Sequence, residues 1–161
     1  MNRVDTFKVA AQGEREIVMT RVFDAPPRLV FDAYTKPELV QQWLLGPDGW
    51  SMPVCEIDLR VGGGFRYVWR HTNGREMKMR GTYREIQSPE RLVHTESFED
   101  PWYPGEAVVT TTLVEQGKGT LLTSTMLVAT REARDGILKS GMERGVARSY
   151  ERLDGVLASL A

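Results

Sequence analysis

The fold is decided by residues 65–98, FRYVWRHTNGREMKMRGTYREIQSPERLVHTESF. Apolar and polar side chains alternate through much of this stretch with a period of two, the pattern of a strand with one buried face. An Asn-Gly pair and a Ser-Pro-Glu turn interrupt the alternation. They divide the stretch into three predicted strands, Phe65–His71, Glu76–Gln87 and Arg91–Phe98. Because short connections join antiparallel neighbours, the stretch predicts a β-meander.

The meander extends in both directions along the chain. The same period of two predicts further strands over Glu16–Asp24, Met52–Arg60, Ala107–Glu115 and Thr120–Ala129. Residues 1–15 are mixed and polar, which is compatible with a loose arm or a weak edge strand. We therefore expect one curved antiparallel sheet of about six or seven strands.

Helices are predicted on both sides of the meander. Before it, Pro26-Pro27 can begin one short helix and Thr35 can cap a second. After it, Glu132–Leu160 has a helical apolar stripe, and a single helix of this length spans roughly 40 Å at ~1.5 Å per residue. Such a helix can cover the apolar face of the sheet, so residues 16–161 are predicted to form one α+β domain.

The composition is that of an ordinary globular domain. Of 161 residues, 41% are apolar and 27% are charged, and 21 basic against 22 acidic side chains leave a net charge of −1. This balance gives no sign of binding to nucleic acid or to an anionic membrane. Two histidines and one cysteine offer no ligand spacing for a metal, and the lone Cys55 fits a reducing cytoplasm. No apolar run reaches transmembrane length, so we expect a cytoplasmic protein without metal or cofactor.

A strongly twisted sheet curls, and a straight helix laid across it cannot touch it everywhere. The gap between helix and sheet is either filled by large side chains, as part of the core, or left as a cavity. The faces that are predicted to surround it are rich in aromatic and methionine side chains, which indicates a pocket for a small apolar or aromatic molecule. The predicted lining is Trp43, Trp50, Tyr67, Trp69, Met77, Met79, His94, Glu96, Phe98, Trp102, Met126 and Met142. Its rim is expected at Trp43, Trp50, Trp102 and Tyr103.

Small residues form a row along the last predicted helix, at Gly141, Gly145 and Ser149. A glycine inside a helix costs about 1 kcal/mol relative to alanine, so the row needs a reason. Close packing of the helix against the sheet is the commoner reason. The alternative is that the helix leaves room for a bound molecule.

His94 and Glu96 are two residues apart on one predicted strand, so both side chains leave the same face. They are candidate catalytic residues, a base and its partner inside the cavity. The alternative is a satisfied polar pair near a sheet edge, because two residues alone lack an orienting partner and a substrate site. The aromatic loop with Trp102 and Tyr103 is expected to cover the cavity mouth or to be buried against a second copy in a homodimer.

The order of elements and several short motifs resemble the AHSA-type family of the START-like (SRPBCC, Bet v-type) superfamily. The motifs span residues 16–160 and include Phe23-Asp24-Ala25-Pro26, Tyr34-Thr35-Lys36-Pro37-Glu38, Trp43, Gly46-Pro47, Asp58-Leu59-Arg60-Val61-Gly62-Gly63, Gly81-Thr82-Tyr83-Arg84-Glu85-Ile86, Pro89-Glu90-Arg91-Leu92 and Ser140-Gly141-Met142. The resemblance implies a helix-grip fold, in which a curved sheet wraps a long C-terminal helix. One departure is Leu44-Leu45 after Trp43, where many members have a second tryptophan.

The resemblance also implies a set of functions. Members of the superfamily hold lipids, sterols, polyketides, hormones or aromatic compounds between sheet and helix. Some are cyclases or hydrolases, and the family is named after a co-chaperone, the activator of the Hsp-90 ATPase. Binding of a small hydrophobic ligand is therefore the expected function. A polyketide cyclase-like or hydrolase-type enzyme and a co-chaperone-like domain with a chaperone partner are the alternatives.

Overall fold

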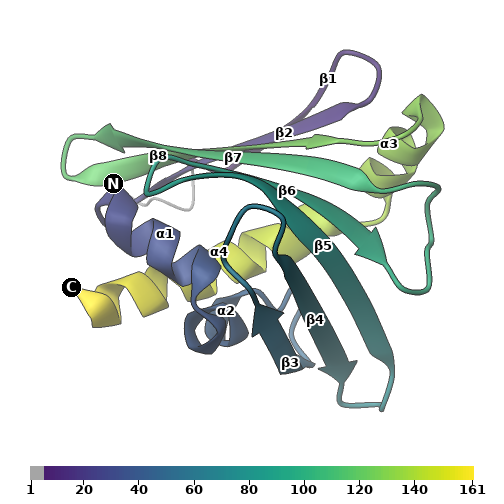
Figure 1. Ribbon diagram of the computed structural model, residues 1–161, viewed down its shortest axis with the longest axis horizontal. Helices are drawn as coiled ribbons and strands as arrows, with labels where there is room; N and C mark the ends of the chain where they lie inside the picture. The colour runs from purple at the N-terminus through teal and green to yellow at the C-terminus, as the bar shows by residue number, and fades with distance from the viewer. Residues whose placement is uncertain (1–5) are drawn as a thin grey trace.

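The computed structural model describes residues 6–161, which form an α+β helix-grip fold (Figure 1). Over this range the sheet has eight strands in the order β1-β2-β8-β7-β6-β5-β4-β3, and all neighbours are antiparallel. The strands are β1 (Lys8–Gln12), β2 (Glu16–Phe23), β3 (Trp50–Ile57), β4 (Gly64–His71), β5 (Glu76–Gln87), β6 (Arg91–Phe98), β7 (Ala107–Gln116) and β8 (Gly119–Leu127). The predicted fold class and the predicted meander are confirmed.

The sheet has more strands than the six or seven that the sequence predicts. The additional strand is β1, an edge strand whose register with β2 runs from Lys8 opposite Thr20 to Gln12 opposite Glu16. Four of its five residues are exposed, so no alternating apolar pattern marks it in the sequence. The first five residues of the predicted arm over 1–15 lie outside the described residues.

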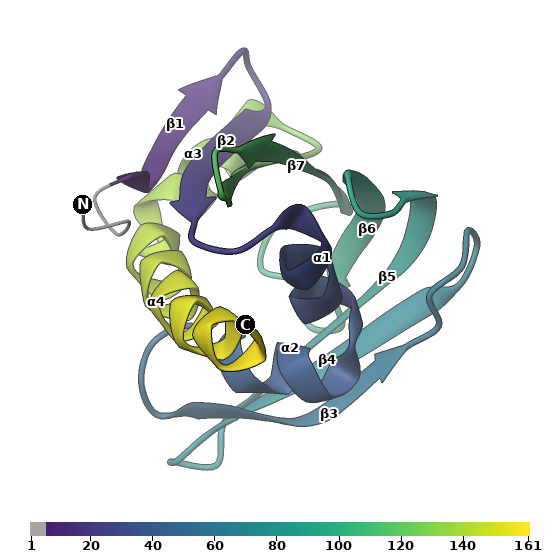
Figure 2. The same ribbon diagram turned by 90° about the vertical axis from the view of Figure 1, so that its left-hand side faces the viewer.

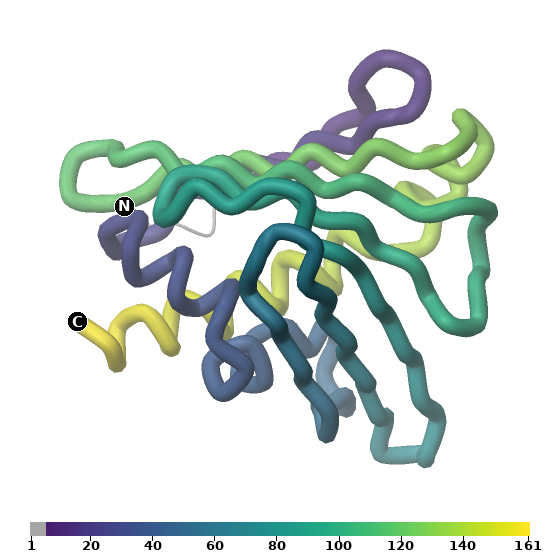
Figure 3. Tube along the Cα trace, in the orientation of Figure 1, coloured from purple at the N-terminus to yellow at the C-terminus, as the bar shows by residue number. Residues whose placement is uncertain are grey.

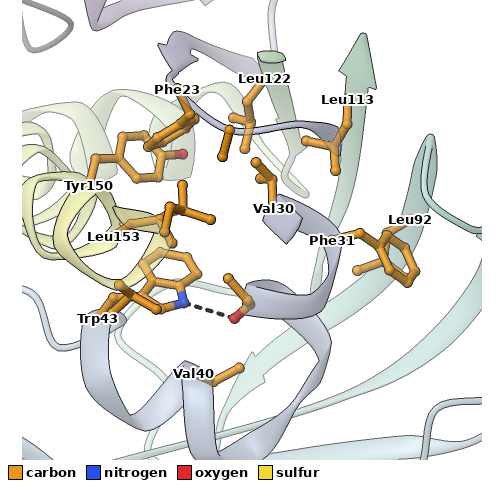
Figure 4. Close-up of a cluster of buried hydrophobic side chains, with 14 of the residues drawn as sticks. Phe23, Val30, Phe31, Val40, Trp43, Leu92, Leu113, Leu122, Tyr150 and Leu153 are labelled. Carbon is orange, nitrogen blue, oxygen red and sulfur yellow. Dashed lines mark hydrogen bonds between the residues drawn. The ribbon is translucent and has the colours of Figure 1, made fainter. Parts of the chain in front are cut away.

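Two short helices, α1 (Pro27–Thr35) and α2 (Pro37–Trp43), lie inside the curl of the sheet (Figure 2). Each begins with a proline, whose missing N–H costs nothing in the first turn of a helix. Their buried sides join the main core cluster, which is drawn in Figure 4. Trp43 is only 1% exposed there, and its Nε1 donates a hydrogen bond to the Ala33 carbonyl at 2.8 Å. We call this cluster around Phe23, Trp43 and Leu153 the packed end.

The C-terminal segment is not the single helix that the sequence predicts. It forms α3 (Arg131–Lys139) and α4 (Met142–Leu160), and the break lies at Gly141, whose φ of 88° is left-handed. Glycine adopts this conformation without the strain that a Cβ would cause, and it commonly ends a helix. The apolar stripe continues across the break, which is why the sequence pattern did not show it.

An ion pair between the buried Arg21 and the half-buried Asp154 joins the sheet to α4 at the packed end. The Arg21 guanidinium on β2 is 1% exposed and donates two hydrogen bonds to the Asp154 carboxylate, at 2.6 and 2.7 Å. Its charged carbon also lies 4.7 Å from the centre of the Phe23 ring. Two parallel hydrogen bonds fix orientation as well as distance, so the pair sets how α4 crosses β2.

The other end of the molecule is built from different segments. The β6–β7 loop and α3 lie at the end of the sheet away from α1, as the tube trace in Figure 3 shows. Helix α4 begins near that end and runs toward α1, inside the curved sheet (Figures 1 and 2). We call this end, where the β6–β7 loop carries Trp102 and Tyr103, the open end.

Candidate ligand-binding site

A cavity of about 500 Å³ lies between the concave face of the sheet and helix α4. All twelve residues of the predicted lining border it: Trp43, Trp50, Tyr67, Trp69, Met77, Met79, His94, Glu96, Phe98, Trp102, Met126 and Met142. The volume is within the usual range of small-molecule sites, roughly 300–1,000 Å³. The role of these residues in binding stays a prediction.

Strand pairing brings the sheet residues of the lining together. Alternate residues share a face, and the register places Tyr67 opposite Met79 and Trp69 opposite Met77 across β4 and β5. Met79 is in turn opposite Phe98 on β6. Each pair lies on the inner face, so three strands contribute one continuous apolar wall.

The cavity opens away from the packed end. Of the lining residues between positions 6 and 161, only Pro47 and Trp102 are exposed, and Trp102 keeps 47% of its surface in solvent. They mark the mouth between the α2–β3 loop and the β6–β7 loop. The prediction that places Trp43 at the rim is wrong, because Trp43, the last residue of α2, is buried in the core of the packed end. Tyr103 is also predicted at the rim, and it is buried as well.

The row of small residues on α4 faces the α2–β3 loop rather than the sheet. A Cβ on Gly145 would lie 3.3 Å from Pro47 Cδ, and Ser149 Oγ accepts a hydrogen bond from the Gly46 N–H at 2.9 Å. Gly141 is the break before α4. Gly145 therefore packs closely against the loop beside the mouth, and the close packing of helix against sheet that the sequence favoured is not found there. Gly145 and Ser149 also border the cavity, so the alternative that the helix leaves room for a bound molecule stays a prediction.

Most polar atoms around the cavity have partners within the protein. The phenol groups of Tyr34 and Tyr150 lie close enough to interact, and so do those of Tyr67 and Tyr83. Burial raises the pKa of all four phenols above the ordinary value of 10, so they are neutral at pH 7. Trp69 Nε1 donates to the Leu44 carbonyl at 2.7 Å, where the motif departs from its family pattern.

The candidate catalytic pair lies inside this cavity. His94 and Glu96 are on β6, an interior strand between β5 and β7, so the alternative of a pair near a sheet edge is wrong. His94 Nδ1 is 3.8 Å from Glu96 Oε2, beyond hydrogen-bond range, and 3.2 Å from the Thr95 carbonyl oxygen. Burial raises the pKa of Glu96, and the neighbouring imidazole lowers it by a smaller amount.

Other predicted features stay apart from the cavity. Cys55 is half-buried on β3, and burial raises the pKa of its thiol to about 11, so it carries no thiolate at neutral pH. Within residues 6–161, no three side chains of the metal-ligating types gather into a site. No helix in the same range is long and apolar enough to span a membrane.

Residues 24–158 match the family model described as Activator of Hsp90 ATPase homolog 1-like protein. The chain belongs to this family. The comparison with curated proteins found no match.

Several solved structures share the fold of this chain. A Rhodobacter sphaeroides protein is 32% identical, with 96% of this chain and 99% of that chain covered and a TM-score of 0.90. A Chromobacterium violaceum protein is 28% identical, with 89% and 96% covered and a TM-score of 0.79. An AHSA1-like protein of Aeromonas hydrophila, 18% identical, shares the fold with a TM-score of 0.73 over 91% and 95% of the two chains.

Sequence reasoning missed several polar residues of this AHSA1-like cavity. Tyr83 could have been found, because it shares a strand face with Met79 and is opposite His94. Thr111 and Ser124 are also on inner strand positions, opposite each other. Tyr34 gave no signal, since its position depends on how α1 enters the curl of the sheet.

Proposed function

We propose that the protein binds a small apolar or aromatic molecule in the cavity between the sheet and α4. The observation that supports this proposal is a cavity of about 500 Å³ whose lining consists mainly of aromatic, methionine and aliphatic side chains. A core that only stabilises the fold packs to high density, with few voids larger than a water molecule. An apolar space of this size gains affinity from the surface that a guest removes from water.

A cavity-filling substitution tests the proposal. Ser124 on β8 is buried and borders the cavity, whereas its neighbour Thr125 does not border it. Ser124→Phe adds a ring inside the cavity, and Thr125→Phe adds the same ring outside it. The probe is the neutral dye N-phenylnaphthylamine, whose fluorescence rises in an apolar site. We expect saturable binding by the wild type and by Thr125→Phe, and at least about tenfold weaker binding by Ser124→Phe.

The outcome separates this proposal from its rivals. Equal dye binding by the two variants, or none by the wild type, contradicts a ligand site in the cavity. A co-chaperone acts through its outer surface, so Ser124→Phe would leave stimulation of a chaperone ATPase unchanged. An enzyme would use His94 and Glu96, but their ring nitrogen and carboxylate are 3.8 Å apart and the base is not oriented by its partner. A cytoplasmic location belongs to the same proposal.

A further inference from the structure

A polar cluster of His94, Glu96 and Tyr103 lies on the wall of the cavity. The Glu96 side chain is 21% exposed, and because the residue borders the cavity on an interior strand, this surface faces the guest space. Its one ionic neighbour within residues 6–161 is His94 Nδ1, at 3.8 Å. The carboxylate therefore has acceptor positions that the protein leaves open.

Tyr103 contributes a second polar group that lacks a hydrogen-bond partner within the described residues. Tyr103 borders the cavity and only 8% of its surface is exposed, yet its hydroxyl has no hydrogen-bond partner within the described chain. The Tyr103 ring lies 6.1 Å from the ring of Phe98, which shares the inner face of β6 with Glu96. The charge of Glu96 also contributes to raising the pKa of the Tyr103 phenol. Buried polar groups in folded proteins are nearly always paired, so this cluster is short of a partner.

The charges around the cavity restrict what that partner is. Over residues 6–161 the lining contains no lysine and no arginine, and Glu96 is its one carboxylate. An anionic guest would bring a second negative charge beside Glu96, and the lining over residues 6–161 offers no lysine or arginine to compensate it, which is costly where water is excluded.

We propose that the guest carries a hydrogen-bond donor, a hydroxyl or an amine, which lies against the Glu96 carboxylate while its apolar body fills the aromatic part of the cavity. This inference rests on the proposed binding function and narrows its ligand class. A hydroxyl also offers an acceptor for the Tyr103 hydroxyl. A protonated amine would gain from the aromatic faces around it. Fatty acids and other carboxylates are disfavoured.

Probes with one ring system and different polar groups test the inference. Naphthalene, naphthol, naphthylmethylamine and naphthoate each compete with N-phenylnaphthylamine for the wild type. A hydrogen bond to a charged acceptor is worth about tenfold in affinity or more. We therefore expect naphthol or naphthylmethylamine to bind about tenfold more tightly than naphthalene, and naphthoate to bind least tightly. The order of the two donors tells which is preferred.

Variants at Glu96 assign the preference to this side chain. Glu96→Leu is expected to bind naphthalene as the wild type does and to lose the advantage of the donor probes. Glu96→Gln keeps an acceptor without the charge, so it should retain part of the naphthol advantage and bind naphthoate better. The control is Glu85→Gln on β5, which does not border the cavity and pairs with Arg91 at 3.2 Å; it should match the wild type.

The possible failures are distinguishable. If donor probes bind no better than naphthalene, or if Glu96→Leu and Glu96→Gln both keep the wild-type order of probes, the role of Glu96 is overturned while the apolar site stands. If the dye does not bind to the wild type, and no probe can therefore displace it, the proposed function fails as well. Thermal unfolding of each variant shows whether it has folded before its affinities are compared.

Discussion

The packed end and the open end use the same aromatic chemistry in opposite ways. At the packed end, Trp43 is buried, its ring N–H has a partner, and the Arg21 charge is fully paired with Asp154. At the open end, Trp102 is half-exposed and the Tyr103 hydroxyl has no partner within residues 6–161. A polar group that is buried without a partner reduces stability, so the presence of such a group at the open end suggests that this end serves a function other than stability.

Truncating one ring at each end should give the largest contrast. Phe23 at the packed end is fully buried, and Phe23→Ala removes a ring whose place the surrounding side chains cannot fill. We expect the free energy of unfolding to fall by about 3–5 kcal/mol. Trp102→Ala at the open end should cost less than about 1 kcal/mol, because nearly half of that ring is already in solvent.

Urea unfolding of both variants measures this contrast. Neither residue change alters the fold, so the slope of the unfolding free energy against urea should stay the same while the midpoint shifts. A loss of similar size for Phe23→Ala and Trp102→Ala would show that the two ends contribute equally to stability. The distinction between them would then be wrong.

Glu96 should make the stability of the open end depend on pH. Burial is the main cause of its raised pKa, so the folded protein holds a proton that the unfolded chain releases above the ordinary value of 4.5. Stability therefore falls as the pH rises from 4.5 through the folded pKa, since the folded state binds more protons over that window. Glu96→Gln removes this contribution and should be more stable than the wild type at pH 8, with a smaller difference at pH 4.

The difference between variant and wild type isolates Glu96 from the other carboxylates. The pKa values of Glu76, Glu99 and Asp135 are lowered by arginine partners on the surface, which gives the opposite slope, but these cancel in the difference. Thermal unfolding at several pH values measures it, with Glu85→Gln as the control. A difference that does not change between pH 4 and pH 8 would mean that Glu96 is not desolvated.

The sequence predicts the wall of the cavity better than its ends. Tyr67, Met79 and Phe98 follow the period of two, and strand pairing then places them together. Trp43 is predicted at the rim because the sequence does not show how deeply a residue of a helix is buried. Its burial follows from the packing of α2 against α4. The break at Gly141 is hidden for a related reason, because an apolar stripe continues across it whether or not the backbone turns.

The polar cluster is the part that sequence reasoning only half recovers. His94 and Glu96 share a face by their spacing alone, so their common position in the cavity is predictable. Whether they contact each other depends on side-chain geometry, and the 3.8 Å separation is visible only in the structure. Tyr103 comes from a loop, for which no periodicity indicates where a side chain points.

The smallest expected effect concerns the hydroxyl of Tyr103, whose contributions to stability and to ligand binding are expected to differ in sign. Tyr103→Phe removes a buried hydroxyl that has no partner within the described residues, so the free energy of unfolding should rise by up to about 1 kcal/mol. Tyr150→Phe removes a buried hydroxyl that interacts with the phenol of Tyr34, and this change should lower the free energy of unfolding by about 1 kcal/mol. The same Tyr103→Phe protein should bind naphthol more weakly than the wild type does. Urea unfolding and dye competition therefore change in opposite directions for Tyr103 if its hydroxyl is kept for a guest, whereas a loss of stability would show that it already has a structural partner.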